Sequence, residues 1–175
     1  MKLAGGAAFT AAVTAQAAKP KRGVQKGRIN QSVVHWCWGE RGWKIEDTAK
    51  AAADLGCKSV ELVSPDDWPV LKKHGLTCAI ASNGVEGPPF MRGFNNPDYH
   101  DMVIKATKET IDACAKFGVK NVIAFNGYKW KKAEDPQSGE ISAEQGAKNC
   151  VKGLKKIIGY AEQKGVTICI EHPNT

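Results

Sequence analysis

The chain has 175 residues, of which 42% are hydrophobic and 25% are charged. This composition is typical of a globular domain and excludes collagen-like, coiled-coil and wholly disordered chains. Its apolar runs are shorter than the roughly 18–20 residues that a bilayer-spanning helix needs, so we expect no membrane span.

The net charge of +7 is concentrated near the N-terminus. Six of the 25 basic residues and none of the 18 acidic residues lie in residues 1–28, so residues 29–175 carry 19 bases against 18 acids. A protein that binds nucleic acid normally has a basic face on its folded domain. We therefore expect no nucleic-acid partner.

The first 18 residues have the pattern of an export signal. Residues 3–15 are small or apolar behind Lys2, and residues 15–17 form an A-x-A cleavage pattern. The stretch resembles the later part of a bacterial twin-arginine signal without the two arginines; a buried Ala-rich helix is the alternative. We expect a signal remnant at 1–18, a basic linker at 19–28 and a periplasmic location, or a cytoplasmic one if the signal does not function.

The six cysteines form no C-x-x-C pair and no dense disulfide framework. Cys78 and Cys169 lie in strand-like apolar runs, and Cys114 and Cys150 lie on helical stripes. We expect buried free thiols, although an oxidising compartment would favour disulfides.

One supersecondary unit recurs through residues 29–175. Four times a helical pattern ends at a glycine and a short β-branched, apolar strand follows, at Gly56, Gly75, Gly118 and Gly165. With a first strand at residues 29–36, five strands alternate with four helices, including helices over 45–55, from Asn96-Pro97 to 117, and from 142 to 161.

This alternation predicts a parallel α/β architecture. The candidates are the first five strands of a (β/α)₈ TIM barrel, truncated after the fifth strand, and an open five-stranded doubly wound sheet. The pattern by itself does not choose between them.

In both architectures functional groups gather at the C-terminal ends of the strands. Glu171 follows the apolar run 167–170, where a buried carboxylate needs a partner or a metal, and it is our candidate catalytic residue and metal ligand. Glu61, between Val60 and Leu62, is a candidate for substrate binding or for pairing with a neighbouring strand.

Further strand-end residues complete the predicted site. Trp36 and Trp38 share one face of the first strand if it is extended, and would wall a polyol pocket. Asn83 and Asn126 follow the third and fourth strands and are candidate substrate-binding residues, whereas His35 is expected to be structural. Residues 84–89 form a candidate lid, and no nucleotide-binding motif is present, so we expect no nucleotide cofactor.

Several short segments in this order resemble one known family. They are Asn30-Gln31-Ser32, Val60-Glu61-Leu62 followed by Pro65 and Trp68, Lys73-His74-Gly75-Leu76-Thr77-Cys78, and Ile170-Glu171. Together they resemble the hydroxypyruvate isomerase branch of the xylose isomerase-like barrels, from about residue 27 to 174. The resemblance favours the barrel over the open sheet.

The resemblance implies an isomerase that interconverts hydroxypyruvate and tartronate semialdehyde through an enediolate. It also implies a pair of glutamates and a divalent metal, Mg²⁺ or Mn²⁺. Only Glu171 matches that pair, and His172-Pro173 departs from the family pattern. We therefore predict that the 175-residue chain does not turn over substrate by itself.

The sequence is also compatible with other functions. The nearest is another sugar or sugar-phosphate isomerase or epimerase. A DNA-repair nuclease is disfavoured because only His35 and His172 lie at strand ends. A non-catalytic, exported carbohydrate-binding barrel and an unrelated open domain are the last alternatives.

Overall fold

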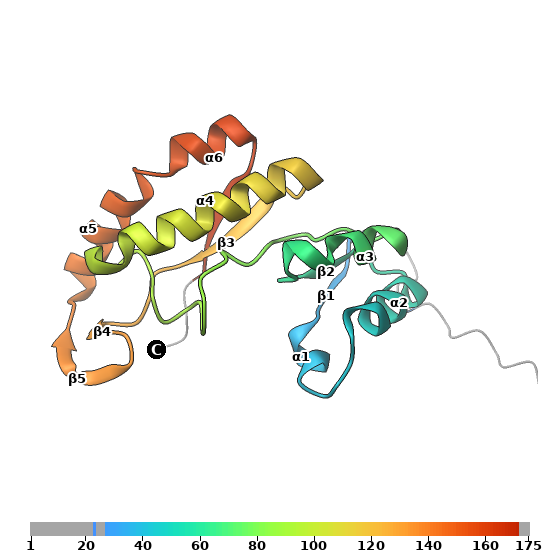
Figure 1. Cartoon of the computed structure of the whole chain (residues 1–175), viewed down its shortest axis with the longest axis horizontal. Coiled ribbons are helices and arrows are strands. Elements are labelled where there is room, and N and C mark those ends of the chain that lie inside the picture. The colour runs from blue at the N-terminus through green and yellow to red at the C-terminus, as the bar shows by residue number, and fades with distance from the viewer. Residues whose placement is uncertain (1–22, 24–26, 172–175) are drawn as a thin grey trace, which may run out of the picture.

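The computed structural model describes residue 23 and residues 27–171 (Figure 1). The predicted signal remnant and most of the basic linker lie outside the described residues, as does His172. The strands are β1 (Ser32–Val34), β2 (Ser59–Glu61), β3 (Asn121–Phe125), β4 (Trp130–Lys132), β5 (Asp135–Glu140) and β6 (Thr167–Glu171). The helices are α1 (Trp36–Gly39), α2 (Ile45–Leu55), α3 (Trp68–Lys73), α4 (His100–Phe117), α5 (Ala143–Leu154) and α6 (Ile158–Lys164), with 3₁₀ turns η1 (Pro65–Asp67) and η2 (Pro97–Tyr99).

The parallel strands lie side by side in chain order. β1 pairs with β2, and β3 pairs with β6, each in parallel. The segment 77–81 joins these two pairs through the parallel bridges Ser59–Thr77 and Ala81–Val122. A doubly wound sheet reverses its strand order partway, whereas a barrel adds each strand on the same side. The order therefore corresponds to five consecutive barrel strands, and the open doubly wound alternative is wrong.

The hydrophobic core lies between this sheet and its helices. Val33 of β1, Val60 of β2, and Val122 and Ala124 of β3 belong to or pack against one buried cluster, together with helical residues such as Leu71, Ile111, Cys114 and Ala161. Because side chains alternate along a strand, the residues between them point to the opposite face of the sheet. We call that opposite face the inner face; it carries Ser32, Glu61, Phe125 and Glu171.

The parallel strands have their C-terminal ends on the same side of the sheet, which we call the strand-end edge. Figure 1 shows α1 and the β4–β5 hairpin at this edge, where the chain leaves β1 and β3. The sheet thus brings the residues that follow different strands to one end of the molecule.

The first predicted strand is too long. β1 ends at Val34, and the chain turns at once into α1 because the backbone N–H groups of Trp38 and Gly39 donate to the carbonyl of His35 at 2.9 and 3.0 Å. Trp36 and Trp38 are therefore helical, and the prediction that they share one face of an extended strand is wrong.

The predicted helix over 142–161 is interrupted. Ser142 caps α5 by accepting from the Gln145 backbone N–H at 3.2 Å, as its pattern predicts. The helix then breaks at residues 155–157, and the fully buried Ile157 precedes α6 with non-helical backbone angles. The break redirects α6 along α4, where the Tyr160 hydroxyl donates to Asp112 at 2.7 Å. The hydrophobic spacing in the sequence continues across residues 155–157, so the sequence pattern does not indicate this break.

The β4–β5 hairpin was not predicted. Trp130 pairs with Glu140 in the antiparallel ladder, yet both strands are mostly polar and exposed. Without apolar alternation, a strand pattern is not visible in the sequence.

Candidate functional site

Two carboxylates end strands on the inner face. Val34 lies opposite Glu61 in the β1–β2 register, and Phe125 lies opposite Glu171 in the β3–β6 register. Glu61 and Glu171 are separated by the segment 77–81 and by β3. With a strand spacing of about 4.8 Å, three steps put them on the order of 10 Å apart or more. That separation is too long for the two carboxylates to share a proton.

Glu61 is held by a neighbouring strand. The hydroxyl of Ser32 in β1 donates to Oε1 of Glu61, which is half-buried. The next residue, Leu62, has a φ of 56°, a left-handed conformation that costs a residue with a Cβ about 1–2 kcal/mol. The hydrogen bond fixes the Glu61 side chain, and the left-handed Leu62 turns the chain out of the strand directly after it. The predicted alternative, in which Glu61 pairs with a residue of a neighbouring strand, is therefore observed.

Glu171 lies at the open end of β6. Its side chain is exposed, so the expectation of a buried charge that needs a compensating partner is not met. It lies next to Phe125, whose side chain is only 6% exposed. An accessible carboxylate at a strand end on the inner face can contact a ligand and exchange a proton with it.

The tryptophans after β1 lie at the same end of the sheet. Trp36 is 57% exposed on α1, while Trp38 contacts Trp43 with ring centroids 6.3 Å apart. His35 forms a 2.9 Å hydrogen bond between its Nδ1 and Oγ1 of Thr48, a buried residue of α2, in agreement with its predicted structural role. The two tryptophans therefore remain candidates for ligand contact, although not as neighbours on a strand.

The two predicted asparagines differ in their surroundings. Asn83 is completely buried; its Oδ1 accepts from the Val85 backbone N–H at 3.2 Å, and its Nδ2 has no partner within the described structure. The amide supports the turn into the predicted lid and is not presented to solvent. Asn126 is half-buried just after β3, where its Oδ1 accepts from the Cys150 thiol at 3.7 Å.

An aromatic group at this edge was missed by sequence reasoning. Phe90, on the loop after the segment 77–81, contacts Phe125 and Tyr128 with centroid separations of 6.4 and 5.9 Å. Tyr128 in turn contacts Trp130 at 5.3 Å. The aromatic doublet Tyr128-x-Trp130 after a strand end was the available signal.

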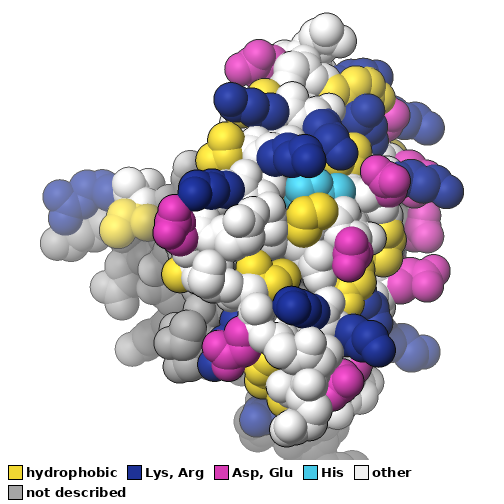
Figure 2. All heavy atoms as spheres, turned by 90° about the vertical axis from the view of Figure 1, so that its left-hand side faces the viewer, with side chains coloured by type: hydrophobic (Ala, Val, Ile, Leu, Met, Phe, Trp, Pro, Cys, Tyr) yellow, Lys and Arg dark blue, Asp and Glu magenta, His cyan; other side chains and the backbone are white. Residues whose placement is uncertain are grey.

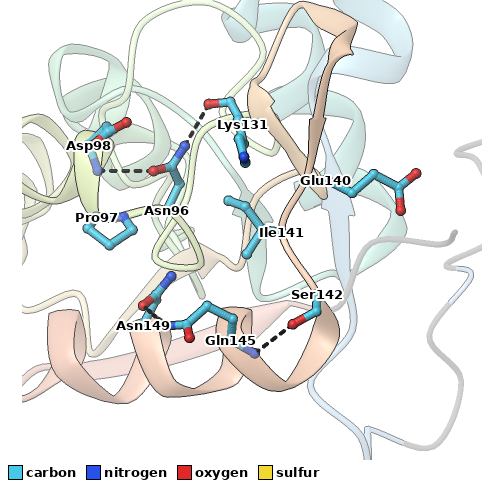
Figure 3. A pocket seen from close by; sticks show the side chains of 9 residues that line it. All are labelled: Asn96, Pro97, Asp98, Lys131, Glu140, Ile141, Ser142, Gln145 and Asn149. Atoms are coloured by element: carbon cyan, nitrogen blue, oxygen red, sulfur yellow. Dashed lines mark hydrogen bonds between the residues drawn. The ribbon is translucent and has the colours of Figure 1, made fainter.

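A pocket of about 470 Å³ lies beside this edge, between η2, the hairpin and the first turns of α5 (Figure 3). Its polar side chains are largely bonded to one another or to the backbone. Asn96 donates to the Lys131 carbonyl at 2.8 Å, Gln145 donates to Asn149 at 2.8 Å, and Asn149 donates to the Asn95 carbonyl at 2.8 Å. We interpret the pocket as a hydrogen-bonded junction that holds the hairpin against η2 and α5.

The described residues do not form a metal centre. Among them, no three His, Cys, Asp or Glu side chains come together as ligands for one ion. Hard divalent cations need several oxygen ligands, and Glu171 supplies one carboxylate.

The surface is mixed in charge on the face formed by the hairpin and α5. Figure 2 shows Lys and Arg side chains interspersed there with Asp and Glu. Ion pairs such as Lys129–Glu140 and Lys148–Glu144, both 2.7 Å, account for part of this pattern. Within the described part of the chain, no helix is long and apolar enough to cross a membrane.

Consecutive parallel strands with helices on one face, and polar groups where the strands end, define part of a β/α-barrel protein. Residues 49–175 match the family model described as "Xylose isomerase-like TIM barrel". The chain belongs to this family. A comparison with curated protein sequences finds no match.

Solved structures show the same fold at low identity. The chain is similar to a D-psicose 3-epimerase with D-tagatose from Clostridium cellulolyticum H10 (TM-score 0.62, 16% identity, 83% of this chain and 53% of that one). It is similar to a mannonate dehydratase from Streptococcus suis serotype 2 (0.54, 16%, 82% and 53%) and a sugar phosphate isomerase/epimerase from Parabacteroides distasonis ATCC 8503 (0.57, 12%, 84% and 53%). The chain spans about half the length of these structures.

Proposed function

We propose that this chain carries the proton-transferring carboxylate of an isomerase that acts on an α-hydroxycarbonyl compound. The observation that carries the proposal is the position of Glu171: accessible, at the C-terminal end of a parallel strand, and on the inner face. The names of the similar structures, which include an epimerase and an isomerase/epimerase, support the same class.

The particular reaction that we propose is the interconversion of hydroxypyruvate and tartronate semialdehyde, on the basis of the family resemblance. The Glu171 carboxylate removes a proton from the hydroxyl-bearing carbon C3, and the electron pair moves to form the enediolate. Transfer of the hydroxyl proton from O3 to O2, with return of the carbon-bound proton to C2, gives tartronate semialdehyde; return of the proton to C3 without the oxygen-to-oxygen transfer regenerates hydroxypyruvate. Asn126 and the tryptophans after β1 are proposed to contact the substrate.

A second candidate is an isomerase or epimerase of a larger sugar. The exposed rings at the strand ends favour it, because a three-carbon acid offers little apolar surface for them to cover.

Proton removal can be tested separately from net isomerisation. We propose incubating the 175-residue chain with hydroxypyruvate in D₂O and following the C3 protons by NMR. We expect deuterium to enter C3 above the buffer rate, with little tartronate semialdehyde formed. Glu171→Gln should lower the exchange rate by roughly 10²-fold or more, with the uncatalysed rate in buffer as the lower limit. Glu162→Gln on the exposed side of α6 is the matched control. Equal exchange by the Glu171→Gln and unsubstituted chains would contradict the proposal.

We also propose that the protein is exported to the periplasm through residues 1–18. Cell fractionation of the tagged chain tests this location. A truncation that begins at residue 19 should remain in the cytoplasm, and periplasmic recovery of that truncation would contradict the proposal.

A further inference from the structure

Three exposed or half-buried rings form a continuous surface that leads away from the strand ends. We call Phe90, Tyr128 and Trp130 the aromatic wall. It begins against Phe125, the register partner of Glu171, and ends at the first residue of β4. The wall thus connects the inner-face carboxylate to the β4–β5 hairpin.

The wall is apolar surface that the described structure leaves uncovered. Phe90 is 39% exposed, and Tyr128 and Trp130 are half-buried. Exposed aromatic groups that cluster beside a strand-end site are characteristic of ligand contact. The rings are tilted rather than coplanar, with interplanar angles of 43° and 85° between neighbours. Such a stepped surface suits a bent, saturated ligand better than one flat heterocycle.

The wall is preformed by the two loops that carry it. The Tyr128 backbone N–H donates to the Met91 carbonyl at 3.0 Å, and the Asn95 side chain donates to the Tyr128 carbonyl at 2.6 Å. Where these loops cross, a Cβ on Gly127 would lie 2.6 Å from the Asn95 Oδ1. A surface that is already ordered loses little entropy when a ligand binds.

Two cations next to the wall, Arg92 and Lys129, form ion pairs. Arg92 forms an ion pair with Glu134, and Lys129 forms one with Glu140 at 2.7 Å. These cations are already neutralised by carboxylates, which favours an uncharged ligand over a phosphorylated one.

We propose that the aromatic wall binds the C–H face of a second, ring-closed sugar unit, so that the ligand of this site is a neutral disaccharide or glycoside. The reacting end of that ligand lies toward Glu171, and the second ring lies on Phe90, Tyr128 and Trp130. This inference rests on the proposed function for the reacting end. It extends that function beyond a three-carbon substrate.

The test compares sugars of different length on the 175-residue chain. Titration calorimetry with D-glucose, maltose and cellobiose should give at least tenfold tighter binding for one of the disaccharides. Trp130→Ala should reduce disaccharide affinity to the glucose level, and Trp130→Phe should retain part of it. Ile158→Ala removes a side chain that is 52% exposed on α6 and should change nothing. Circular dichroism confirms that each variant is folded.

Two results would overturn the inference: equal or undetectable binding of all three sugars, or disaccharide binding that Trp130→Ala leaves unchanged. The proposed function fails separately. If Glu171→Gln does not alter deuterium exchange while Trp130→Ala abolishes disaccharide binding, the wall is a sugar site and the assigned base is wrong.

Discussion

Glu61 and Glu171 end two strands on the same face of the sheet, yet their surroundings differ. Glu61 accepts a hydrogen bond from Ser32 and is half-buried, whereas Glu171 is exposed beside Phe125. A carboxylate that is already hydrogen-bonded is suited to orienting a ligand. An accessible one is suited to moving a proton, so we assign proton transfer to Glu171 and ligand orientation to Glu61.

The loop crossing beneath the aromatic wall makes Gly93 intolerant of a side chain. A Cβ at this position would overlap the Asn126 backbone. Gly93→Ala should therefore cost about 1–3 kcal/mol of stability, because forced overpacking displaces the backbone. Gly159→Ala in α6 meets nothing within 4 Å and should stabilise the chain by up to about 1 kcal/mol. Chemical denaturation measures both; equal stability of the two variants would contradict the close crossing.

Ile157 should behave as a core residue although it lies in the break between α5 and α6. It is fully buried, so Ile157→Ala is expected to cost about 2–5 kcal/mol and Ile157→Val about 0.5–1.5 kcal/mol. Urea unfolding curves provide the measurement. A cost below about 1 kcal/mol for the alanine variant would mean that the break does not bury this side chain.

The cysteines should differ widely in reactivity. Burial, with a smaller contribution from the nearby Cys78, raises the pKa of the Cys114 thiol to about 12, while Cys37 is exposed. Because the thiolate is the reactive form, iodoacetamide at pH 8 should modify Cys37 in the folded chain and Cys114 only after unfolding. Peptide mass mapping over time tests the order, and early labelling of Cys114 would refute it.

The contact between α4 and α6 should make stability depend on pH. Hydrogen bonds from Lys164 and Tyr160 lower the pKa of Asp112. A lowered folded-state pKa gives stability that is fully present above the unfolded-state value, about 3.9, and is lost as pH falls through the folded-state value. Asp112→Asn should therefore reduce the drop in Tm between pH 5 and pH 2.5.

The matched control for Asp112 is Glu144→Gln. Glu144 forms a pair with Lys148 in which both side chains are highly exposed, so little change in Tm is expected. An acid-induced drop that is the same in Asp112→Asn as in the unsubstituted chain would show that this contact contributes nothing.

Much of the barrel was predictable because its signals are local. Gly56, Gly118 and Gly165 adopt positive φ at the helix ends where the pattern placed them, and the apolar runs after them form β2, β3 and β6. Helix α2 has its predicted bounds, 45 to 55. These features depend on residues that are close together in the chain, so they can be predicted from one sequence.

The site was predicted less completely because its geometry depends on distant segments. Phe90 meets Tyr128 only because two loops cross at Gly93, and nothing near residue 90 indicates that contact. The burial of Asn83 and the turn at Trp36 likewise follow from tertiary packing and local hydrogen bonding. The position of Glu171 was predictable because it depends only on where β6 ends.

The most direct test of the central claim compares Glu171→Gln with Glu61→Gln in the same deuterium-exchange measurement. Our account predicts that Glu171→Gln lowers deuterium exchange at C3 of hydroxypyruvate by roughly 10²-fold or more, because the base is removed. The uncatalysed rate in buffer is the lower limit of this decrease. It predicts that Glu61→Gln retains exchange within about tenfold, because a glutamine still accepts the Ser32 hydrogen bond and orients the ligand. The reverse result, with exchange lost in Glu61→Gln and kept in Glu171→Gln, would contradict the account.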